Sequence, residues 1–211
     1  MNNLNSLSLR KRFFAWILKK GDAVNDKIYG SFKKDLFKNI SGRVAEIGPG
    51  TGVNFSFLPK NIEWIGIEPN PAFHETLRTK AEAKGIKANL VSGTSDDIPL
   101  GDNALDVVLS TLVLCSVEDP AKTIAEIKRV LKPGGRFFFI EHVASAESKS
   151  LLFAQNICNP FNRLAADGCN CNRRTWTFIQ HGGFSEVNMK HVDMKGTLIL
   201  HKPHIMGYAV K

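Results

Sequence analysis

Val44-Ala-Glu-Ile-Gly-Pro-Gly-Thr-Gly-Val-Asn54 is the stretch around which this 211-residue chain is built. Residues 43–47 predict a short strand, and residues 52–58 predict a helix. Between them stand three glycines, at positions 48, 50 and 52. A residue without a Cβ can take dihedral angles closed to others and lets the backbone approach a ligand. The stretch therefore predicts a strand, a ligand-binding turn and a helix in succession.

The spacing of these glycines bears on which ligand the turn accepts. A dinucleotide-binding turn has the pattern G-x-G-x-x-G and places a pyrophosphate on the helix N-terminus. Here the pattern is G-x-G-x-G, which argues against a Rossmann oxidoreductase, and Glu46 precedes the first glycine by two positions. That pattern suits a ligand without phosphate whose tail carries an ammonium group, such as S-adenosylmethionine. A tight turn without any ligand is the alternative.

The remainder of the chain alternates between apolar strands and helical segments. Such alternation predicts an α/β fold with a parallel sheet and helices on both faces. In these sheets a ligand binds beyond the carboxyl ends of the strands, where Gly48, Glu68, Ser95, Thr111 and His142 fall. The predicted strands are 43–47, 64–68, 88–92, 105–112, 137–143, 185–191 and 206–211, and the predicted helices after 52–58 are 71–84, 120–131, 147–165 and 173–181.

Several residues at these strand ends are candidates for the cofactor site. Glu68 ends the second strand, 20 residues after Gly48, where an acid accepts hydrogen bonds from ribose hydroxyls. After the third strand, Ser95 and Asp96 can accept from an adenine amino group. The full predicted set is Glu46, Gly48, Pro49, Gly50, Gly52, Glu68, Pro69, Asn70, Ser95, Asp96, Thr111 and Leu112.

As a set, these motifs resemble class I S-adenosylmethionine-dependent methyltransferases over residues 40–145. The resemblance rests on Glu46-x-Gly-x-Gly-x-Gly52, Glu68, the Asp96/Asp97 loop, Asp106-Val-Val and Leu131-Lys-Pro-Gly-Gly135. It implies S-adenosylmethionine as donor and S-adenosylhomocysteine as product. It also implies a Rossmann-like seven-stranded sheet in the order 3-2-1-4-5-7-6, with the last strand antiparallel.

A narrower resemblance extends to the end of the chain. The chain is similar to the methyltransferase-like 7 proteins, which are animal alkyl-thiol S-methyltransferases. This likeness implies methyl transfer to a small apolar thiol. The animal proteins begin with a hydrophobic membrane anchor, whereas this chain begins with a basic arm. The likeness rests on Thr111-Leu-Val-Leu-Cys-Ser-Val117, Glu141-His-Val143, Asp167-Gly-Cys169 and Pro203-His-Ile-x-Gly-Tyr-Ala-Val-Lys211.

Transfer to a thiol benefits from a base, because the thiolate is the nucleophile. His142, at the end of the fifth strand, is the candidate base, and Asp167 could orient it or accept the proton. Ordinary structural roles for both residues stay open. Two other acceptors also fit a basic protein at a membrane, namely the amine of phosphatidylethanolamine and a ring carbon of a quinone. A non-catalytic S-adenosylmethionine-binding protein is the alternative of another class.

The charge distribution divides the chain into a basic helical arm, residues 1–38, and a methyltransferase domain, residues 39–211. The net charge is +8, and residues 1–38 hold nine Lys or Arg against three Asp. Helices predicted at 10–20 and 22–38 could form a lid over the cofactor or touch an anionic membrane; nucleic acid is a weaker alternative. No apolar run reaches the roughly 18 residues of a membrane span. These features predict a cytoplasmic protein with the option of a peripheral contact at a membrane, and they leave its oligomeric state unknown.

The four cysteines, Cys115, Cys158, Cys169 and Cys171, lack a common zinc-binding spacing. The sequence therefore predicts reduced thiols and no metal site. Cys115, inside an apolar segment, is predicted to be a small buried hydrophobic residue.

Overall fold

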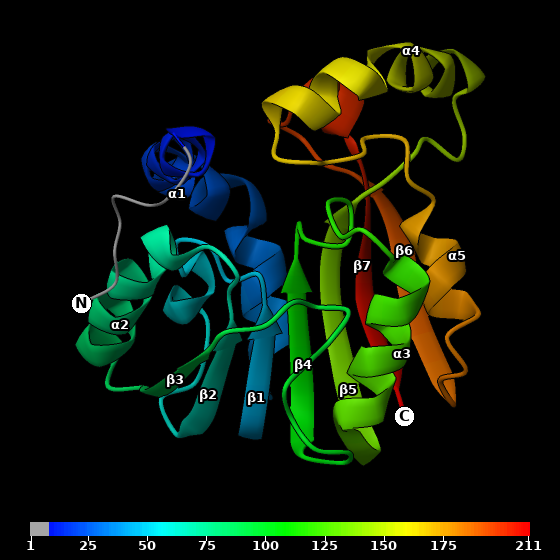
Figure 1. Ribbon diagram of the computed structural model, residues 1–211. Helices are drawn as coiled ribbons and strands as arrows, with labels where there is room; N and C mark the ends of the chain where they lie inside the picture. The colour runs from blue at the N-terminus through cyan, green and yellow to red at the C-terminus, as the bar shows by residue number, and fades with distance from the viewer. Residues whose placement is uncertain (1–8) are drawn as a thin grey trace.

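A single seven-stranded sheet forms the centre of the molecule (Figure 1). The computed structural model describes residues 9–211, without the side chains of residues 9–14 and 17. The side chains of Phe13, Phe14 and Ile17, which belong to the predicted helix 10–20, therefore lie outside the described part of the structure.

The strand order is β3-β2-β1-β4-β5-β7-β6, which confirms the predicted topology. The first five strands pair in parallel, and β7 runs antiparallel to both β5 and β6. Strands β1 and β4 are adjacent, so the chain reverses its direction of winding between them, beside the glycine turn. The strands are β1 (Gly42–Ile47), β2 (Ile62–Ile67), β3 (Lys87–Val91), β4 (Leu105–Thr111), β5 (Leu131–His142), β6 (Glu186–Asp193) and β7 (Pro203–Val210).

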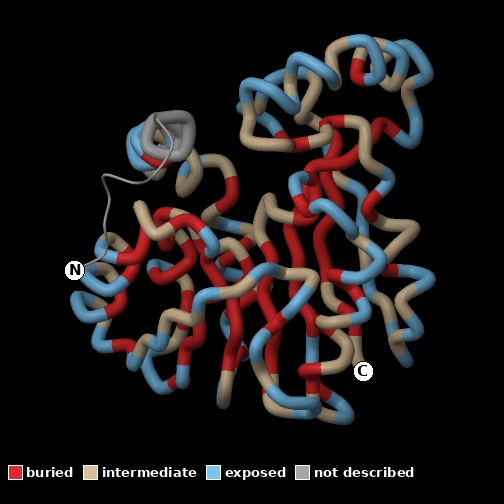
Figure 2. Tube along the Cα trace, viewed as in Figure 1, coloured by how far each residue is buried: buried red, intermediate tan, exposed pale blue. Residues whose placement is uncertain are grey.

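Helices cover both faces of this sheet and bury two large apolar clusters against it, and a smaller third cluster lies where Tyr29 packs on β5 and β7. One large cluster joins the sheet to α3 and α5, and the other large cluster joins it to α1 and α2. Figure 2 shows the central strands almost wholly buried, while α4 is largely exposed. The helices are α1 (Leu9–Phe37), α2 (His74–Lys84), α3 (Pro120–Val130), α4 (Lys149–Ala165) and α5 (Thr175–Gln180), with single 3-10 turns η2 (Val53–Ser56), η3 (Pro71–Phe73) and η4 (Ile199–His201).

The predicted helix starts follow from capping chemistry. The Asp119 side chain accepts a hydrogen bond from the Lys122 backbone N–H at the start of α3, and Pro120 occupies the first helical position. Asn70 caps the turn η3 in the same way, by accepting from Ala72 N–H at 3.1 Å.

The N-terminal helices predicted at 10–20 and 22–38 are a single helix, α1, of 29 residues. Asp22 was expected to begin a second helix. Instead Asp22 lies within the helix, and its carboxylate contacts two other segments of the chain. It accepts a hydrogen bond from Thr51 Oγ1 and forms an ion pair with Lys80 Nζ, both at 2.6 Å. Tertiary contacts thus hold the helix continuous through Gly21. Further along, the Tyr29 hydroxyl is hydrogen-bonded to His204 Nε2 at 2.9 Å, which ties α1 to β7.

Among the other boundaries that differ from the prediction, two lie beside the glycine turn and at the start of β5. The expected helix 52–58 is only the 3-10 turn η2, because Gly52 is in the left-handed conformation (φ +73°) immediately before it. Strand β5 begins at Leu131, directly after α3, and not at residue 137. Leu131 pairs with Leu105, and a register shift lies between Leu105 and Val107.

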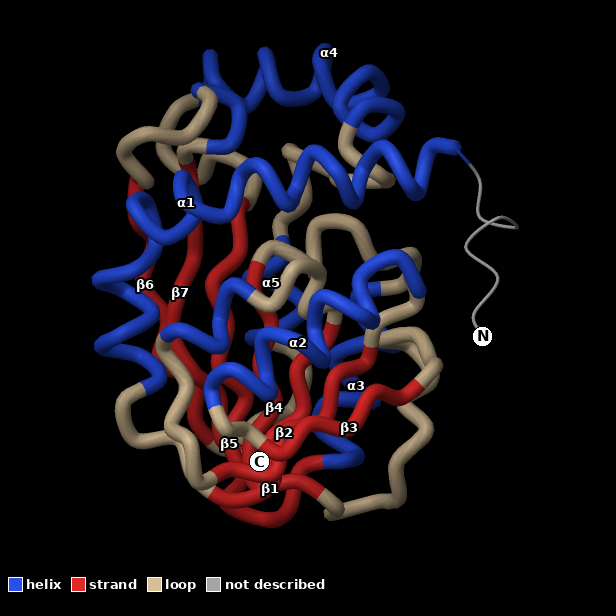
Figure 3. Tube along the Cα trace, turned by 90° about the vertical axis from the view of Figure 1, so that its left-hand side faces the viewer, coloured by secondary structure: helices blue, strands red, loops and turns tan. Residues whose placement is uncertain are grey.

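The first part of α1 and helix α4 lie at the end of the molecule to which the parallel strands point, and the remainder of α1 continues along the sheet (Figures 1 and 3). The end to which the strands point is the end at which the sequence places the ligand. Within the described part of the chain, no helix is both long and apolar enough to cross a membrane.

Candidate active site

The glycine turn after β1 has the conformation that its sequence requires. Gly48, Gly50 and Gly52 all have positive φ angles, between +54° and +73°. A Cβ on Gly48 would come within 2.8 Å of Val113, but one on Gly50 would meet nothing closer than 4.0 Å. The backbone at Gly50 therefore faces open space, as a ligand-binding turn must.

Glu68 connects this turn to the end of β2. Its carboxylate accepts hydrogen bonds from Gly50 N–H at 2.9 Å and from Asn70 N–H at 2.8 Å. The side chain is buried, yet it reaches the wall of the adjacent cavity. A carboxylate can accept more than two hydrogen bonds, so these backbone contacts orient Glu68 without exhausting its capacity.

A cavity of about 500 Å³ opens beyond these strand ends. The turn at 48–51, Glu68 and the residues that follow it form part of its wall. Helix α1 contributes four residues that sequence reasoning did not assign to the site: Leu18, Gly21, Asp22 and Asn25. Of the predicted cofactor residues, those that line the cavity are Gly48, Pro49, Gly50, Glu68, Pro69, Asn70, Ser95, Asp96, Thr111 and Leu112.

Two predicted cofactor residues, Glu46 and Gly52, are not among the lining residues. The Glu46 carboxylate is buried and accepts hydrogen bonds from Asn54 Nδ2 at 2.8 Å and Trp64 Nε1 at 3.0 Å. Burial raises the pKa of this carboxyl. Glu46 thus supports the turn from within, and the structure does not bring it to the cavity where the sequence placed it.

The positive charge of Lys33, on α1, acts on this buried acid and opposes the rise in the pKa of Glu46. Lys33 is fully buried and donates to Asn25 Oδ1 at 2.6 Å. Burial lowers the pKa of Lys33 to about 8, opposed by the negative charges of Glu46, Asp26 and Asp22. No sequence signal marks this lysine, since its burial depends on how α1 packs.

The two predicted catalytic residues are placed differently. Asp167 lines the cavity, in a left-handed conformation (φ +47°) before Gly168. His142 is not among the lining residues; it is buried, and its Nε2 is hydrogen-bonded to Cys169 Sγ at 3.0 Å. The expected placement of His142 at the acceptor is therefore not observed, because the loop that carries Cys169 packs against its ring.

Glu141, beside it, is a buried acid that the sequence analysis quoted only as part of a motif and did not assign to the site. It accepts hydrogen bonds from Ser110 Oγ at 2.5 Å and from Leu114 N–H at 3.0 Å. Burial raises the pKa of Glu141 to about 7, despite these hydrogen bonds. Glu141 thereby holds the loop after β4, which contributes Leu112 and Val113 to the cavity wall.

Comparison with known proteins agrees with this architecture. The family described as "Methyltransferase domain" matches residues 45–139. Human thiol S-methyltransferase TMT1A is 35% identical, over 95% of this chain and 87% of its own length. Mouse thiol S-methyltransferase TMT1B is 37% identical with the same coverage. This chain belongs to the TMT1 family of class I methyltransferases.

Solved structures of more distant proteins share the fold of this TMT1 family member. A methyltransferase from Thermotoga maritima, described as a possible histamine N-methyltransferase, superposes with a TM-score of 0.69 at 20% identity, covering 96% of this chain and 98% of that one. An S-adenosylmethionine-dependent methyltransferase from Aquifex aeolicus gives 0.64 at 16% identity, with 93% and 97% covered. The methyl donor of this TMT1 family enzyme is S-adenosylmethionine.

The charge of the cavity fits that donor, which carries a sulfonium and an ammonium group. Five carboxylates line the wall, and the described lining residues include no Lys or Arg. Such a wall favours a cation and disfavours a pyrophosphate. The volume also lies within the roughly 300–1,000 Å³ of small-molecule sites. The five acids are Asp22, Glu68, Asp96, Glu118 and Asp167.

Proposed function

We propose that this methyltransferase methylates the sulfur of a small apolar thiol. The observation that carries the proposal is that one cavity wall combines the carboxylate of Asp167 with the apolar side chains of Leu112, Val113 and Val117. An apolar acceptor would bury its chain there, with its sulfur close to a carboxylate. The name of the relatives, thiol S-methyltransferase, supports the same acceptor chemistry.

Bound S-adenosylmethionine supplies a methyl group on a positively charged sulfur. In the proposed site, Glu68 accepts hydrogen bonds from the ribose hydroxyls, and the backbone at 48–50 contacts the rest of the donor. Ser95 and Asp96 face the adenine. The predicted residues Pro49, Pro69, Asn70, Thr111 and Leu112 complete the wall, whereas Glu46 and Gly52 act by shaping the turn.

The chain's contribution to the acceptor is position and proton removal. An ordinary thiol has a pKa of about 8.5 and is a poor nucleophile until it loses its proton. We assign the proton-accepting role to Asp167, because it lines the cavity and His142 does not. The rest of the rate enhancement comes from holding the acceptor sulfur in line with the methyl group.

Methyl transfer to short alkyl thiols, detected as thioether by mass spectrometry, tests the proposal. We expect turnover with thiols, and a fall of roughly 10²-fold or more for Asp167→Asn with little change in donor affinity. Asp97→Asn, an exposed acid outside the cavity, is the matched control. Methylation of phosphatidylethanolamine or a quinone without methylation of thiols would overturn the acceptor assignment. Donor binding without turnover on any of these acceptors would instead favour a binding protein.

We further propose that α1 closes over the donor and that the same end of the molecule can meet an anionic membrane. Four residues of α1 line the cavity, which supports the lid. Exposed apolar residues on one side of α4, together with the basic charge of residues 1–38, support a peripheral membrane contact. The apolar residues are Phe153, Ile157, Phe161 and Leu164.

A further inference from the structure

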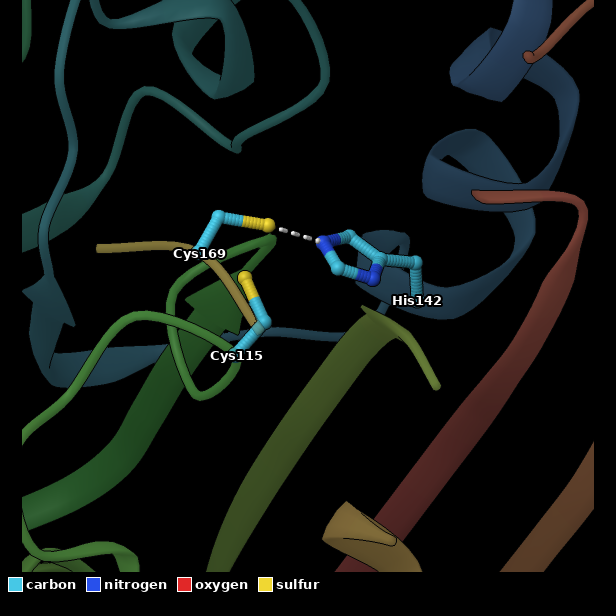
Figure 4. A group of neighbouring side chains, drawn as sticks. All are labelled: Cys115, His142 and Cys169. Atoms are coloured by element: carbon cyan, nitrogen blue, oxygen red, sulfur yellow. Dashed lines mark hydrogen bonds between the residues drawn. The ribbon is translucent and has the colours of Figure 1, made fainter. Parts of the chain in front are cut away.

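Three side chains from distant parts of the chain meet behind the cavity wall. Cys115 lies in the turn after β4, His142 ends β5, and Cys169 lies in the loop after α4. Figure 4 shows both sulfurs and the imidazole converging on one point. Their ligand atoms all lie within 4.8 Å of one another, and all three residues are buried.

We propose that Cys115, His142 and Cys169 bind a zinc ion. Two thiolates and an imidazole are a donor set that soft and borderline metals prefer. With Zn–S bonds of about 2.3 Å and Zn–N bonds of about 2.0 Å, tetrahedral ligand atoms stand about 3.5–3.8 Å apart. In the structure His142 Nε2 and Cys169 Sγ are 3.0 Å apart and no pair of the three ligand atoms exceeds 4.8 Å, so side-chain rotations would complete the site.

Charge balance favours this occupant in a buried place. Binding replaces two thiol protons, which leave to solvent, and forms two Zn–S bonds and one Zn–N bond. The two thiolate charges cancel the charge of the ion, so the buried unit is neutral. A neutral unit avoids the large penalty for burying a net charge.

The surroundings of Cys169 already resemble the outer shell of a metal ligand. Asn162 Nδ2 donates to Cys169 Sγ at 3.3 Å and to the Cys169 carbonyl at 2.7 Å. The Asn170 side chain and backbone both donate to the Cys115 carbonyl, at 3.0 and 2.9 Å. Hydrogen bonds of this kind hold ligands in place before the metal arrives.

The imidazole turns one of its two nitrogens toward the cluster. His142 Nε2 faces sulfur, while its buried Nδ1 has no hydrogen-bond partner in the described part of the chain. The support for the site therefore comes from Nε2, and zinc bound there would place the ring proton on Nδ1. The ring of His201 meets that of His142 edge-on at 4.8 Å between centroids, beside the cluster, while the three mutually close ligand atoms belong to Cys115, His142 and Cys169.

The ion would connect two loops that contribute residues to the cavity wall. Ser116, next to Cys115, and Asp167, two residues before Cys169, both line the cavity. Zinc at this point joins the turn after β4 to the loop after α4 and so fixes the position of Asp167. In this role it is a positioning ion and does not enter the methyl-transfer chemistry.

Metal binding to the full-length reduced protein tests the inference. After exposure to zinc and desalting, we expect about one zinc per chain by elemental analysis. Cobalt(II) in place of zinc is expected to give a sulfur-to-metal charge-transfer band and the visible bands of a tetrahedral ion. Cys115→Ser, His142→Gln and Cys169→Ser should each lower zinc affinity by more than about tenfold. Cys158→Ser is the matched control, because this half-buried cysteine lies outside the cluster and should bind zinc as the wild type does.

A measurement on the wild type covers the case in which a ligand variant does not fold. Zinc should slow alkylation of Cys115 and Cys169, but not of Cys158, in peptide maps compared with chelator-treated protein. Less than about a tenth of a zinc per chain, or equal binding by the folded variants, would overturn the site. A Cys115–Cys169 disulfide in protein purified without reductant would also overturn it and identify a redox pair instead.

Discussion

Glu68 is the single side chain whose loss should act most directly on the donor. Glu68→Ala removes an acceptor for the ribose hydroxyls and strands the N–H groups of Gly50 and Asn70. We expect S-adenosylhomocysteine binding to weaken by about 1–3 kcal/mol in calorimetry. Glu63→Ala, which removes an exposed acid of β2, should leave the affinity unchanged. Equal affinity of wild type and Glu68→Ala would exclude Glu68 from the site.

Glu141 predicts a pH dependence of stability. Burial raises the pKa of Glu141 to about 7 from an ordinary value of 4.5, so the folded state holds a proton that the unfolded state has lost. The stabilisation linked to this proton is complete below pH 4.5 and is lost as the pH rises through 7, a change on the order of 3 kcal/mol.

Glu141→Gln should remove this part of the pH dependence. Urea unfolding at several pH values between 4.5 and 7.5 measures it, and Glu82→Gln, an exposed acid on α2, serves as the control. If the wild type and Glu141→Gln show the same slope of unfolding free energy against pH, Glu141 is ionised throughout this range.

At the scale of the elements, the contact between α1 and the glycine turn should control how firmly α1 covers the cavity. Asp22→Ala removes the hydrogen bond from Thr51 and the ion pair with Lys80. Because both partners are partly exposed, we expect a loss of about 1–2 kcal/mol in donor affinity. Faster hydrogen exchange in the first half of α1 should accompany that loss.

Asp35→Ala changes an exposed acid on the same helix and is expected to alter neither quantity. Wild-type affinity and exchange in Asp22→Ala would mean that α1 covers the cavity without controlling it.

At the scale of the whole molecule, the membrane proposal predicts salt-sensitive binding. The full chain should sediment with anionic vesicles at low salt and stay in the supernatant at high salt or with neutral vesicles. Phe161→Asp, at an exposed position of α4, should reduce sedimentation without affecting methyl transfer to a soluble thiol. A full chain that stays in the supernatant at low salt would leave α1 as a lid alone.

The features that the sequence predicted are those that depend on residues close together in the chain. Alternating strands and helices specify the parallel sheet, and the glycines at 48, 50 and 52 specify the turn, because backbone dihedrals depend on neighbouring residues. The resemblance to known methyltransferases supplied the strand order, which the structure confirms. Glu68 and Asp96 were predictable as cavity residues because residues that end parallel strands meet at one edge of the sheet.

Only the tertiary structure could settle the contacts between segments far apart in the chain. It turned Glu46 inward to Asn54 and Trp64, kept α1 continuous past Gly21, and buried the side chain of Lys33 on that helix. It also separated His142 from the cavity and joined it to cysteines 27 residues away in each direction along the chain. The spacing of these residues in the sequence does not predict this contact. The loops that carry the two cysteines are positioned by tertiary packing and not by local propensity.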